Sequence, residues 1–212
     1  MRLDDFTDIK YTKEDNGICT ATISRPERRN ALSQLTFLEL FYVLEDMEKD
    51  NDAKVLILTG DPKGRAFTSG GYFSPDALKE VPKEIAQDIQ YNDVAQKRLA
   101  MRLFTFYKPV ITAINGLAIG AGTTMPLMGA DLIYMAEDAW MGFYFNKRAI
   151  IPEFSLSFVL PFYLGFQKAK ELLYLSDRIT AKQAFKLGLV NSVLPNDQLM
   201  QFTREQALKL IL

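Results

Sequence analysis

Two glycine-containing turns are the first residues in this sequence whose types and spacing suggest chemistry. They read FTSGGYFS at 67–74 and NGLAIGAGTT at 115–124, and each follows an apolar, strand-like run. Glycine lets the backbone N–H groups of such turns approach a ligand closely. The spacing of Gly116, Gly120 and Gly122 differs from the G-x-G-x-x-G dinucleotide fingerprint, and the chain has no G-K-[ST] phosphate loop. We therefore expect the turns to face a different negative charge, or simply to permit tight helix–strand packing.

An oxyanion hole is the chemistry that the two turns would allow together. An N–H group at the start of the helix after 115–124 lies at the positive end of the helix dipole, where an anion is stabilised. Gly71 offers a second N–H group from the other turn. Two such donors aimed at one carbonyl oxygen stabilise the charge that develops there, and removing one typically costs ~3–4 kcal/mol of barrier lowering.

Few side-chain types remain for proton transfer. The chain has no histidine, which excludes Ser-His-Asp catalysis, histidine zinc ligands and imidazole bases. Glu153 stands out because apolar residues flank it: Ile150, Ile151, Pro152, Phe154 and Leu156. Burial among them is expected to raise its pKa toward neutrality, where a carboxyl group can both accept and return a proton. The alternative is an exposed loop glutamate or a helix cap.

The elements expected to position these residues alternate between strand and helix. Residues 9–25 predict a hairpin that turns at Asp15-Asn16-Gly17, and Ser33 predicts the cap of the following helix. Buried strands are expected at 54–60, 110–116 and 130–138. Further helices are expected over 76–106, after the 115–124 turn, in short segments at 157–165, 168–177 and 180–188, and from 197 onward, with an extended piece at 189–195. This alternation predicts one α/β domain.

Composition limits the classes of function. The chain has 212 residues, 48% of them hydrophobic, which suits one globular domain with a substantial core. Lys and Arg number 25 against 26 Asp and Glu, so no nucleic-acid partner is expected. The single cysteine, Cys19, excludes an intramolecular disulfide and fits a reducing compartment. No secretory signal or membrane-spanning run is evident, so a cytoplasmic protein is expected.

Six segments in order and at family-like spacing resemble the crotonase superfamily of enoyl-CoA hydratases and isomerases. They are ISRPERRNALS (23–33), KVLILTG (54–60), RAFTSGGYFS (65–74), KPVITAINGLAIGAG (108–122), ADLIYMAEDAWMGF (130–143) and DRITAKQAFKLGLVNSV (177–193). The resemblance implies the ClpP-like spiral of ββα turns with a helical C-terminal region. It divides the chain into a core domain at 1–195 and the start of that helical region, cut short, at 196–212. It also implies assembly as a homotrimer or a dimer of trimers.

The same resemblance assigns a site. The thioester oxygen of an acyl-CoA would lie between the N–H groups of Gly71 and Ala121, which stabilise an enolate without an ionised side chain. Hydratases of the family use two glutamates, and their positions here hold Thr124 and, by the simplest alignment, Phe145. Glu153 resembles the single acid/base of the peroxisomal-type Δ3,Δ2-enoyl-CoA isomerases, which lies in a PEG segment. This chain departs from that segment with Phe154 and Ser155, where the family commonly has small residues.

The resemblance therefore implies an enoyl-CoA isomerase that shuttles a proton through Glu153. An enoyl-CoA hydratase or another crotonase-type lyase or hydrolase is one alternative, and a non-catalytic acyl-CoA-binding protein is another. The substrate is an acyl-CoA thioester whose coenzyme A needs no separate cofactor, and no metal is expected. Substrate-binding candidates are Arg28, Asn30, Ala31, Ala66, Phe67, Ser69, Gly70, Tyr72, Gly120, Thr124 and Phe145.

Two further expectations concern the ends of the bound substrate. Arg28, Asn30 and Ala31 would contact the nucleotide end of CoA, although a solvated charge run explains Arg28 and Arg29 equally well. An aromatic acyl pocket would draw on residues that cluster around the aligned positions: Phe67, Tyr72, Phe73, Trp140, Phe143, Tyr144, Phe145, Phe154 and Phe158. Most of these are expected to be ordinary core residues, because aromatic side chains fill cores more often than they line sites.

Overall fold

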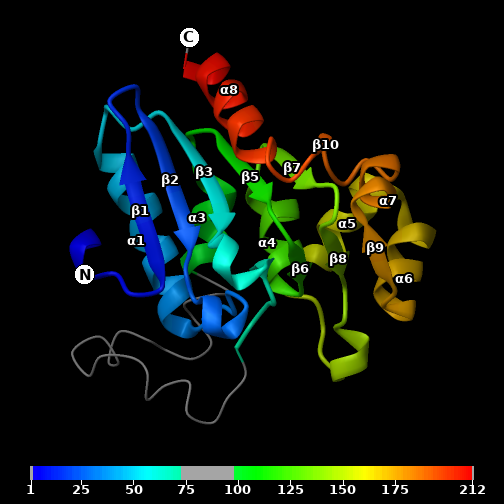
Figure 1. The fold of residues 1–212 in the computed structure, drawn as a ribbon. Helices are drawn as coiled ribbons and strands as arrows, with labels where there is room; N and C mark the ends of the chain where they lie inside the picture. Colours follow the sequence, from blue (N-terminus) through cyan, green and yellow to red (C-terminus); the bar gives the residue numbers. More distant parts are fainter. Residues whose placement is uncertain (1, 73–97, 212) are drawn as a thin grey trace.

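A six-stranded sheet forms one layer of the fold (Figure 1). The computed structural model describes residues 2–72 and 98–211, and the strand order in this sheet is β1-β2-β3-β5-β7-β10. The strands are β1 (Ile9–Lys13), β2 (Ile18–Ile23), β3 (Val55–Gly60), β5 (Val110–Ile114), β7 (Leu132–Ala136) and β10 (Ser192–Leu194). The β1–β2 pair is antiparallel, and every other neighbouring pair is parallel.

The predicted N-terminal hairpin is confirmed. Its turn closes where the Glu14 N–H group donates to the Ile18 carbonyl at 2.9 Å, and the Ile18 N–H group donates to Asn16 Oδ1 at 2.9 Å. Gly17 has a positive φ of 89°, and a Cβ there would lie 2.5 Å from Lys54 Cγ. Only glycine therefore fits this turn against the start of the neighbouring strand.

A second sheet of four short strands packs alongside the first. It has the order β4 (Ala66–Thr68), β6 (Leu117–Ile119), β8 (Trp140–Gly142) and β9 (Arg178–Thr180). The β4–β6 and β6–β8 pairs are parallel, and the β8–β9 pair is antiparallel. In chain order, β3 leads to β4, β5 to β6 and β7 to β8 (Figure 1). This repetition is the expected spiral of ββα turns with one minor sheet.

The structure corrects the expected single strand at 110–116. The chain leaves the larger sheet after Ile114 and enters the smaller sheet at Leu117. A Cβ on Gly116 would lie 2.9 Å from Ala66 Cα, so glycine permits the close crossing between the two sheets. Strands of three residues are too short to show a periodicity of two, which explains why the sequence did not predict β6, β8 or β9.

Helices cover both faces of the larger sheet. The described helices are α1 (Gln34–Lys49), α3 (Ala100–Thr105), α4 (Ala121–Gly129), α5 (Leu156–Leu164), α6 (Phe166–Leu175), α7 (Ala181–Lys186) and α8 (Leu199–Ile211), with short 3₁₀ turns η1 (Leu3–Asp5), η2 (Pro26–Arg28), η3 (Pro62–Gly64) and η6 (Asn146–Arg148). Ser33 caps α1 as predicted, because its Oγ accepts from the Thr36 N–H group at 3.0 Å. Of the helix expected at 76–106, residues 76–97 lie outside the described residues, and α3 lies in the remainder.

The core lies between these helices and the sheet. All six residues of β3 are buried, because α8 packs against β2, β3, β5 and β7 while α1 packs against β1 and β2. The rings of Tyr134 in β7 and Phe202 in α8 meet edge to face at 5.1 Å, which confirms the predicted final helix and its docking on the sheet. No helix in the described part of the chain is long and apolar enough to cross a membrane.

Candidate active site

The two glycine turns lie against each other. Because β4 and β6 are parallel neighbours, the turns that follow them emerge at the same edge of the smaller sheet. Gly70 has a φ of 90°, and a Cβ there would lie 2.6 Å from the carbonyl oxygen of Ile119 and 3.8 Å from Gly120 Cα. The backbone of one turn therefore touches the backbone of the other, and only glycine at position 70 permits this approach.

The N–H group of Gly71 is held between two anchored peptides. The Leu32 N–H group donates to the Gly70 carbonyl at 2.8 Å, and the Tyr72 N–H group donates to the Leu32 carbonyl at 2.8 Å. Because backbone groups alternate in direction along an extended segment, the Gly71 N–H group points away from Leu32. No described residue accepts a hydrogen bond from it. Gly71 therefore presents a fixed N–H donor that is unused within the described part of the chain.

Ala121 presents the second donor. It is the first residue of α4, where the N–H group has no acceptor within the helix. The Gly120 carbonyl is already taken by the N–H groups of Thr123 and Thr124, at 2.8 and 3.0 Å. Gly120 itself has φ 55° and ψ −118°, a conformation open to glycine and unfavourable for other residues. A helix start with a free N–H group is the kind of position that binds an anion.

Tight packing also explains one glycine of this turn. A Cβ on Gly122 would lie 2.7 Å from Thr68 Cγ2 and 2.9 Å from the Thr68 carbonyl oxygen. Gly122 therefore lets α4 rest directly on β4, which is the alternative interpretation of these glycines. Gly120 and Gly122 serve different purposes, conformation in the first case and close approach in the second.

Glu153 lies beside this donor pair through a contact with α4. The Thr124 hydroxyl donates to Glu153 Oε1 at 3.1 Å, and Thr124 is fully buried. Residues three apart share a helix face, so Thr124 lies one turn beyond Ala121 on α4. Burial raises the pKa of the Glu153 carboxyl group, while its own backbone N–H group and Thr124 oppose the rise. The raised pKa agrees with the direction expected from the flanking apolar residues.

The loop that carries Glu153 has an unusual backbone. Phe154 and Ser155 both have positive φ angles, 49° and 52°, in the left-handed region that side chains other than glycine rarely adopt. Phe154 is buried, and its ring lies 6.3 Å from that of Phe37 in α1. The buried ring anchors the loop, and this anchoring offsets the backbone strain and holds Glu153 toward α4.

Four of the expected substrate-binding residues are fully buried. Asn30, Ala66, Phe67 and Thr124 have no exposed surface, so their side chains line no open surface in this structure. The Asn30 amide is used internally: Nδ2 donates to the carbonyls of Asp61 and Ala66, at 3.0 and 2.7 Å. Asn30 has a positive φ, which a short amide side chain tolerates. Its two hydrogen bonds join the turn at 28–30 to the segments next to Asp61 and Ala66.

Four of the eight described aromatic residues expected around an acyl pocket belong to the core: Phe67, Phe143, Phe145 and Phe154. Phe143, Phe145 and Phe154 are buried at 0%, 4% and 4% exposure, whereas Phe158 is 68% exposed. Tyr144 and Trp140 are half-buried neighbours whose ring centroids lie 6.3 Å apart. Phe73 lies outside the described residues.

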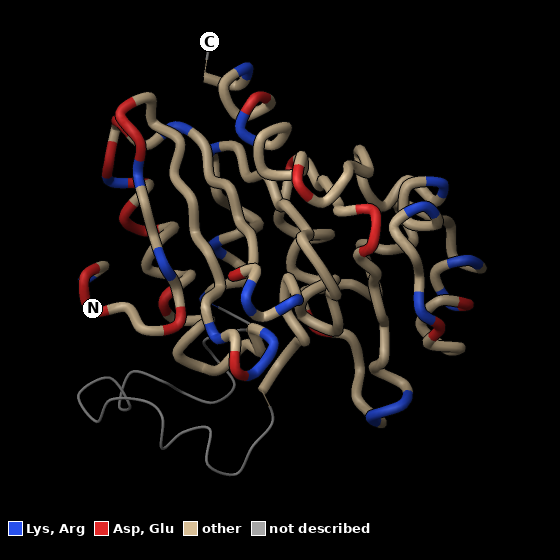
Figure 2. The backbone as a smooth tube through the Cα atoms, in the orientation of Figure 1, with Lys and Arg blue, Asp and Glu red and all other residues tan. Residues whose placement is uncertain are grey.

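Basic residues gather beside the first glycine turn. The turns η2 and η3 contact each other, and Figure 2 shows their Lys and Arg positions close together. The exposed members are Arg28, Arg29, Lys63 and Arg65. Arg28 Nη1 donates to the Tyr72 hydroxyl at 2.5 Å, and the Ser69 N–H group donates to the Arg29 carbonyl at 3.1 Å. This positive surface suits a phosphate-bearing group. Among the described residues, no group of three or more His, Cys, Asp or Glu could hold a metal ion.

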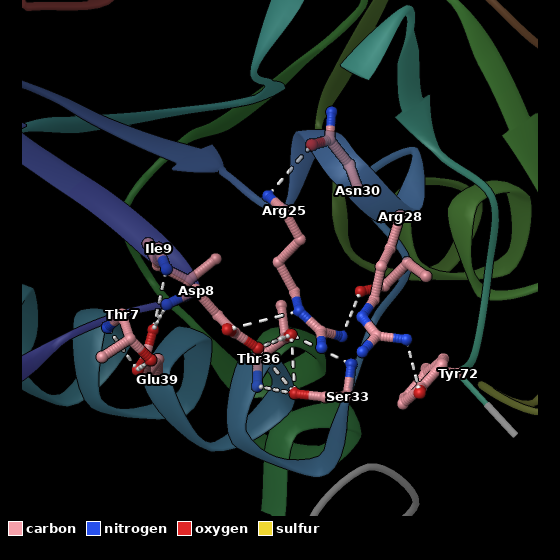
Figure 3. A network of polar contacts seen from close by, with 11 residues as sticks. Thr7, Asp8, Ile9, Arg25, Arg28, Asn30, Ser33, Thr36, Glu39 and Tyr72 are labelled. Atoms are coloured by element: carbon pink, nitrogen blue, oxygen red, sulfur yellow. Dashed lines mark hydrogen bonds and ion pairs between the residues drawn. The ribbon is translucent and has the colours of Figure 1, made fainter. Parts of the chain in front are cut away.

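A buried polar network behind the turn was not predicted from the sequence (Figure 3). Its charged members are Asp8, Arg25 and Glu39, at 8%, 5% and 0% exposure. Burial raises the pKa of Glu39 to about 7, although its carboxylate accepts hydrogen bonds from backbone N–H groups. Arg25 lies inside the RPERRNAL segment that the sequence singled out. Asp8 and Glu39 carry no local signal, because their contacts join residues that are distant in the chain.

Comparison with known proteins agrees with this geometry. The sequence profile described as Enoyl-CoA hydratase/isomerase matches residues 13–211. A putative enoyl-CoA hydratase from Thermus thermophilus is 32% identical over 182 residues, covering 86% of this chain and 70% of that protein. A 1,2-epoxyphenylacetyl-CoA isomerase from Escherichia coli is 31% identical over 194 residues, covering 91% and 72%. A solved enoyl-CoA hydratase from Bacillus anthracis superposes with a TM-score of 0.83 at 29% identity, over 96% of this chain and 76% of that one. The chain therefore belongs to the crotonase superfamily, the enoyl-CoA hydratase/isomerase family of acyl-CoA-processing enzymes.

Proposed function

We propose that this protein is an enoyl-CoA isomerase that moves a C=C bond by shuttling one proton through Glu153. The observation that carries the proposal is the hydrogen bond from Thr124 to Glu153, which puts a carboxyl group one helical turn from the Ala121 N–H group. Relatives carry both hydratase and isomerase names. The choice between the two activities therefore rests on the residues of this chain.

The reaction needs one carboxylate and two N–H donors. Glu153 takes a proton from C2 of a 3-enoyl-CoA, and the electron pair of that C–H bond moves into the conjugated system. The resulting dienolate carries its charge on the thioester oxygen, which the N–H groups of Gly71 and Ala121 stabilise. Protonated Glu153 returns the proton at C4. The double bond then lies between C2 and C3, Glu153 is again ionised, and no water is consumed.

The residues at the aligned hydratase positions support isomerisation over hydration. Thr124 and Phe145 stand where the family's hydratases hold two glutamates, and neither can act as a base at neutral pH. Phe145 is 4% exposed and packs in the core, so it does not line a water channel in this structure. Adding water across a double bond needs a group that activates the water. These two positions supply none.

A product analysis tests the proposal. Purified protein is incubated separately with panels of 3-enoyl-CoA and 2-enoyl-CoA esters, and the products are separated and weighed by mass spectrometry. We expect interconversion of the positional isomers with no change of mass. A product heavier by one water would show a hydratase and overturn the isomerase assignment. Tight binding of the esters without any product would show a non-catalytic acyl-CoA-binding protein instead.

Assembly as a homotrimer or a dimer of trimers is part of the same proposal. Large apolar side chains on and next to α5 support it, because Phe158, Phe162 and Phe166 are 68%, 75% and 71% exposed. Exposed aromatic side chains in such numbers are typical of surfaces that become buried against a partner. Light scattering during size-exclusion chromatography measures the mass directly, and a monomer at micromolar concentration would contradict this part.

A further inference from the structure

We propose that the buried Asp8–Arg25 ion pair is a positioning device for the oxyanion hole, which holds the Gly71 N–H group in place through Leu32 and Tyr72. The inference rests on the proposed function only in assigning Gly71 as a donor to a thioester oxygen. Neither Asp8 nor Arg25 was predicted from the sequence as a catalytic or substrate-binding residue. Their role would be exerted through the backbone next to the turn and through the Tyr72 ring.

Arg25 connects three separate parts of the molecule (Figure 3). Its Nε lies 3.3 Å from Asp8 Oδ1, and its Nη1 donates to the Ala31 carbonyl at 2.9 Å. Its guanidinium carbon also lies 5.2 Å from the centroid of the Tyr72 ring. A planar guanidinium can make such contacts at the same time because its donors point in fixed directions.

Asp8 is held firmly enough to fix Arg25. Its Oδ2 accepts hydrogen bonds from the hydroxyls of Ser33 and Thr36, at 2.6 and 2.5 Å, while Oδ1 faces Arg25. The Asp8 N–H group donates to Glu39 Oε2 at 2.9 Å, and the Ile9 N–H group donates to the same oxygen at 2.7 Å. Both carboxylate oxygens of Asp8 and both of Glu39 therefore have partners, which restricts the motion of the two side chains.

The path from Arg25 to the oxyanion turn is short. Arg25 fixes the carbonyl of Ala31, and the next residue, Leu32, makes both backbone hydrogen bonds that hold Gly70 and Tyr72. Gly71 lies between those two anchored residues. A shift of the 31–32 backbone would therefore move the Gly71 N–H group with it.

Tyr72 is held from a second side as well. The Arg28 guanidinium carbon lies 4.5 Å from the centroid of its ring, and Arg28 Nη1 donates to its hydroxyl at 2.5 Å. Two guanidinium groups thus contact one aromatic ring, an arrangement that restricts its rotation. The arginine–tyrosine contact therefore supports the turn from this second side.

The energetics of buried ion pairs favour a positioning role. Replacing such a pair with apolar residues is often neutral or stabilising, so the pair is weak evidence for stability alone. Misplacing a donor at a reacting centre by about 1 Å can lower a rate roughly 10²-fold. The network therefore has more effect on the geometry of the donor than on the free energy of unfolding.

The test measures how strongly the N–H donors polarise a bound thioester carbonyl group, and it also measures turnover. A saturated acyl-CoA with a ¹³C-labelled thioester carbonyl is bound to the protein, and the carbonyl stretch is read by difference infrared or Raman spectroscopy. In wild type we expect the band to shift to lower frequency, because two N–H donors polarise the carbonyl. Asp8→Asn and Arg25→Met are expected to lose most of this shift. They should lower kcat about 10²-fold with KM little changed, while binding of free CoA stays as in wild type.

The matched control is Arg102→Met. Arg102 also forms partly buried ion pairs, with Glu45 and Glu48 at 3.1 and 2.6 Å, but these lie near the C-terminal end of α1, whereas Ser33 and Leu32 lie at its N-terminal end. The thioester carbonyl band of an acyl-CoA bound to Arg102→Met should shift as far as it does in wild type. An unchanged shift in folded Asp8→Asn and Arg25→Met proteins would overturn the positioning role.

Two further outcomes separate the proposals. If Asp8→Asn and Arg25→Met fail to fold, Tyr72→Ala decides, because Tyr72 is only half-buried: a reduced shift supports the positioning role and a wild-type shift overturns it. A wild-type protein that shifts the carbonyl band but isomerises no ester would refute the isomerase while leaving the positioning role standing. A wild-type protein that shifts no band would refute the oxyanion hole and the positioning role together.

Discussion

Thr124 in α4 and Glu153 in the loop before α5 are joined by a 3.1 Å hydrogen bond, although 29 positions separate them in the chain. The family resemblance aligns Thr124 with a position where hydratases have a glutamate. A hydroxyl group there cannot act as a base, but it can donate to one and fix its direction. The hydrogen bond therefore places one carboxyl group against α4, the helix that begins at Ala121.

Glu153→Gln should abolish isomerisation while leaving acyl-CoA binding largely intact. The amide keeps an oxygen that accepts from Thr124, so the loop stays in place, but it cannot take up a proton. Loss of a general acid/base typically costs about 10²–10⁴-fold in rate. Single-turnover assays and calorimetric titration with a saturated acyl-CoA measure the two properties separately. A Gln variant that retains the wild-type rate would end the assignment of Glu153.

The pH dependence of kcat/KM should report the raised pKa of Glu153. Proton abstraction needs the ionised carboxylate, so activity should rise with pH through a pKa above the ordinary glutamate value of 4.5. The Thr124 hydroxyl stabilises the ionised form, and its removal in Thr124→Val should move this acid limb to higher pH. Rate profiles of both proteins with one 3-enoyl-CoA measure the shift. A limb that moves to lower pH would contradict the hydrogen bond as described.

Glu153→Gln should also stabilise the fold at neutral pH. Because the folded-state pKa is above the unfolded value, the favourable contribution of Glu153 is complete below the unfolded pKa and is lost as pH rises through the folded pKa. The neutral amide has no such loss. Urea denaturation between pH 4 and pH 8 should show the two proteins diverging as pH rises, with the variant the more stable. Parallel curves across this range would show that burial of the carboxylate carries no penalty.

Gly120→Ala should disable the oxyanion hole through backbone conformation. A Cβ at this position would meet nothing within 4 Å, so a steric clash is not the cause. The φ of 55° with ψ −118° is the cause, because a residue with a side chain would rotate away and turn the Ala121 N–H group aside. We expect kcat to fall about 10²–10³-fold, as for loss of one oxyanion donor.

Gly188→Ala is the control for that variant. Gly188 also has a positive φ, 74°, and open space around its Cβ position, but it lies in the loop after α7. It should lose comparable stability and keep the wild-type rate and carbonyl shift. Equal loss of activity in both variants would show that the effect of Gly120→Ala is general destabilisation.

The hairpin, the cap at Ser33, the buried strands and the final helix could all be predicted because their signals are local. A turn of Asn and Gly, a hydroxyl before an apolar helix and a run of buried residues each act over a few neighbouring positions. The short strands β6, β8 and β9 could not be predicted, since three residues show no period and their pairing partners are distant in the chain.

The features of the candidate site also fall into those that the sequence predicted and those that only the structure revealed. The sequence by itself determined the glycine turns, the absence of histidine and, through the family resemblance, the choice of Gly71, Ala121 and Glu153. Only the tertiary structure decided that Thr124 reaches Glu153, that Asn30 faces inward, and that Asp8 and Arg25 stand behind the turn. The physical reason is that hydrogen bonds between distant segments depend on how sheets and helices pack, and packing leaves no periodic trace in the sequence.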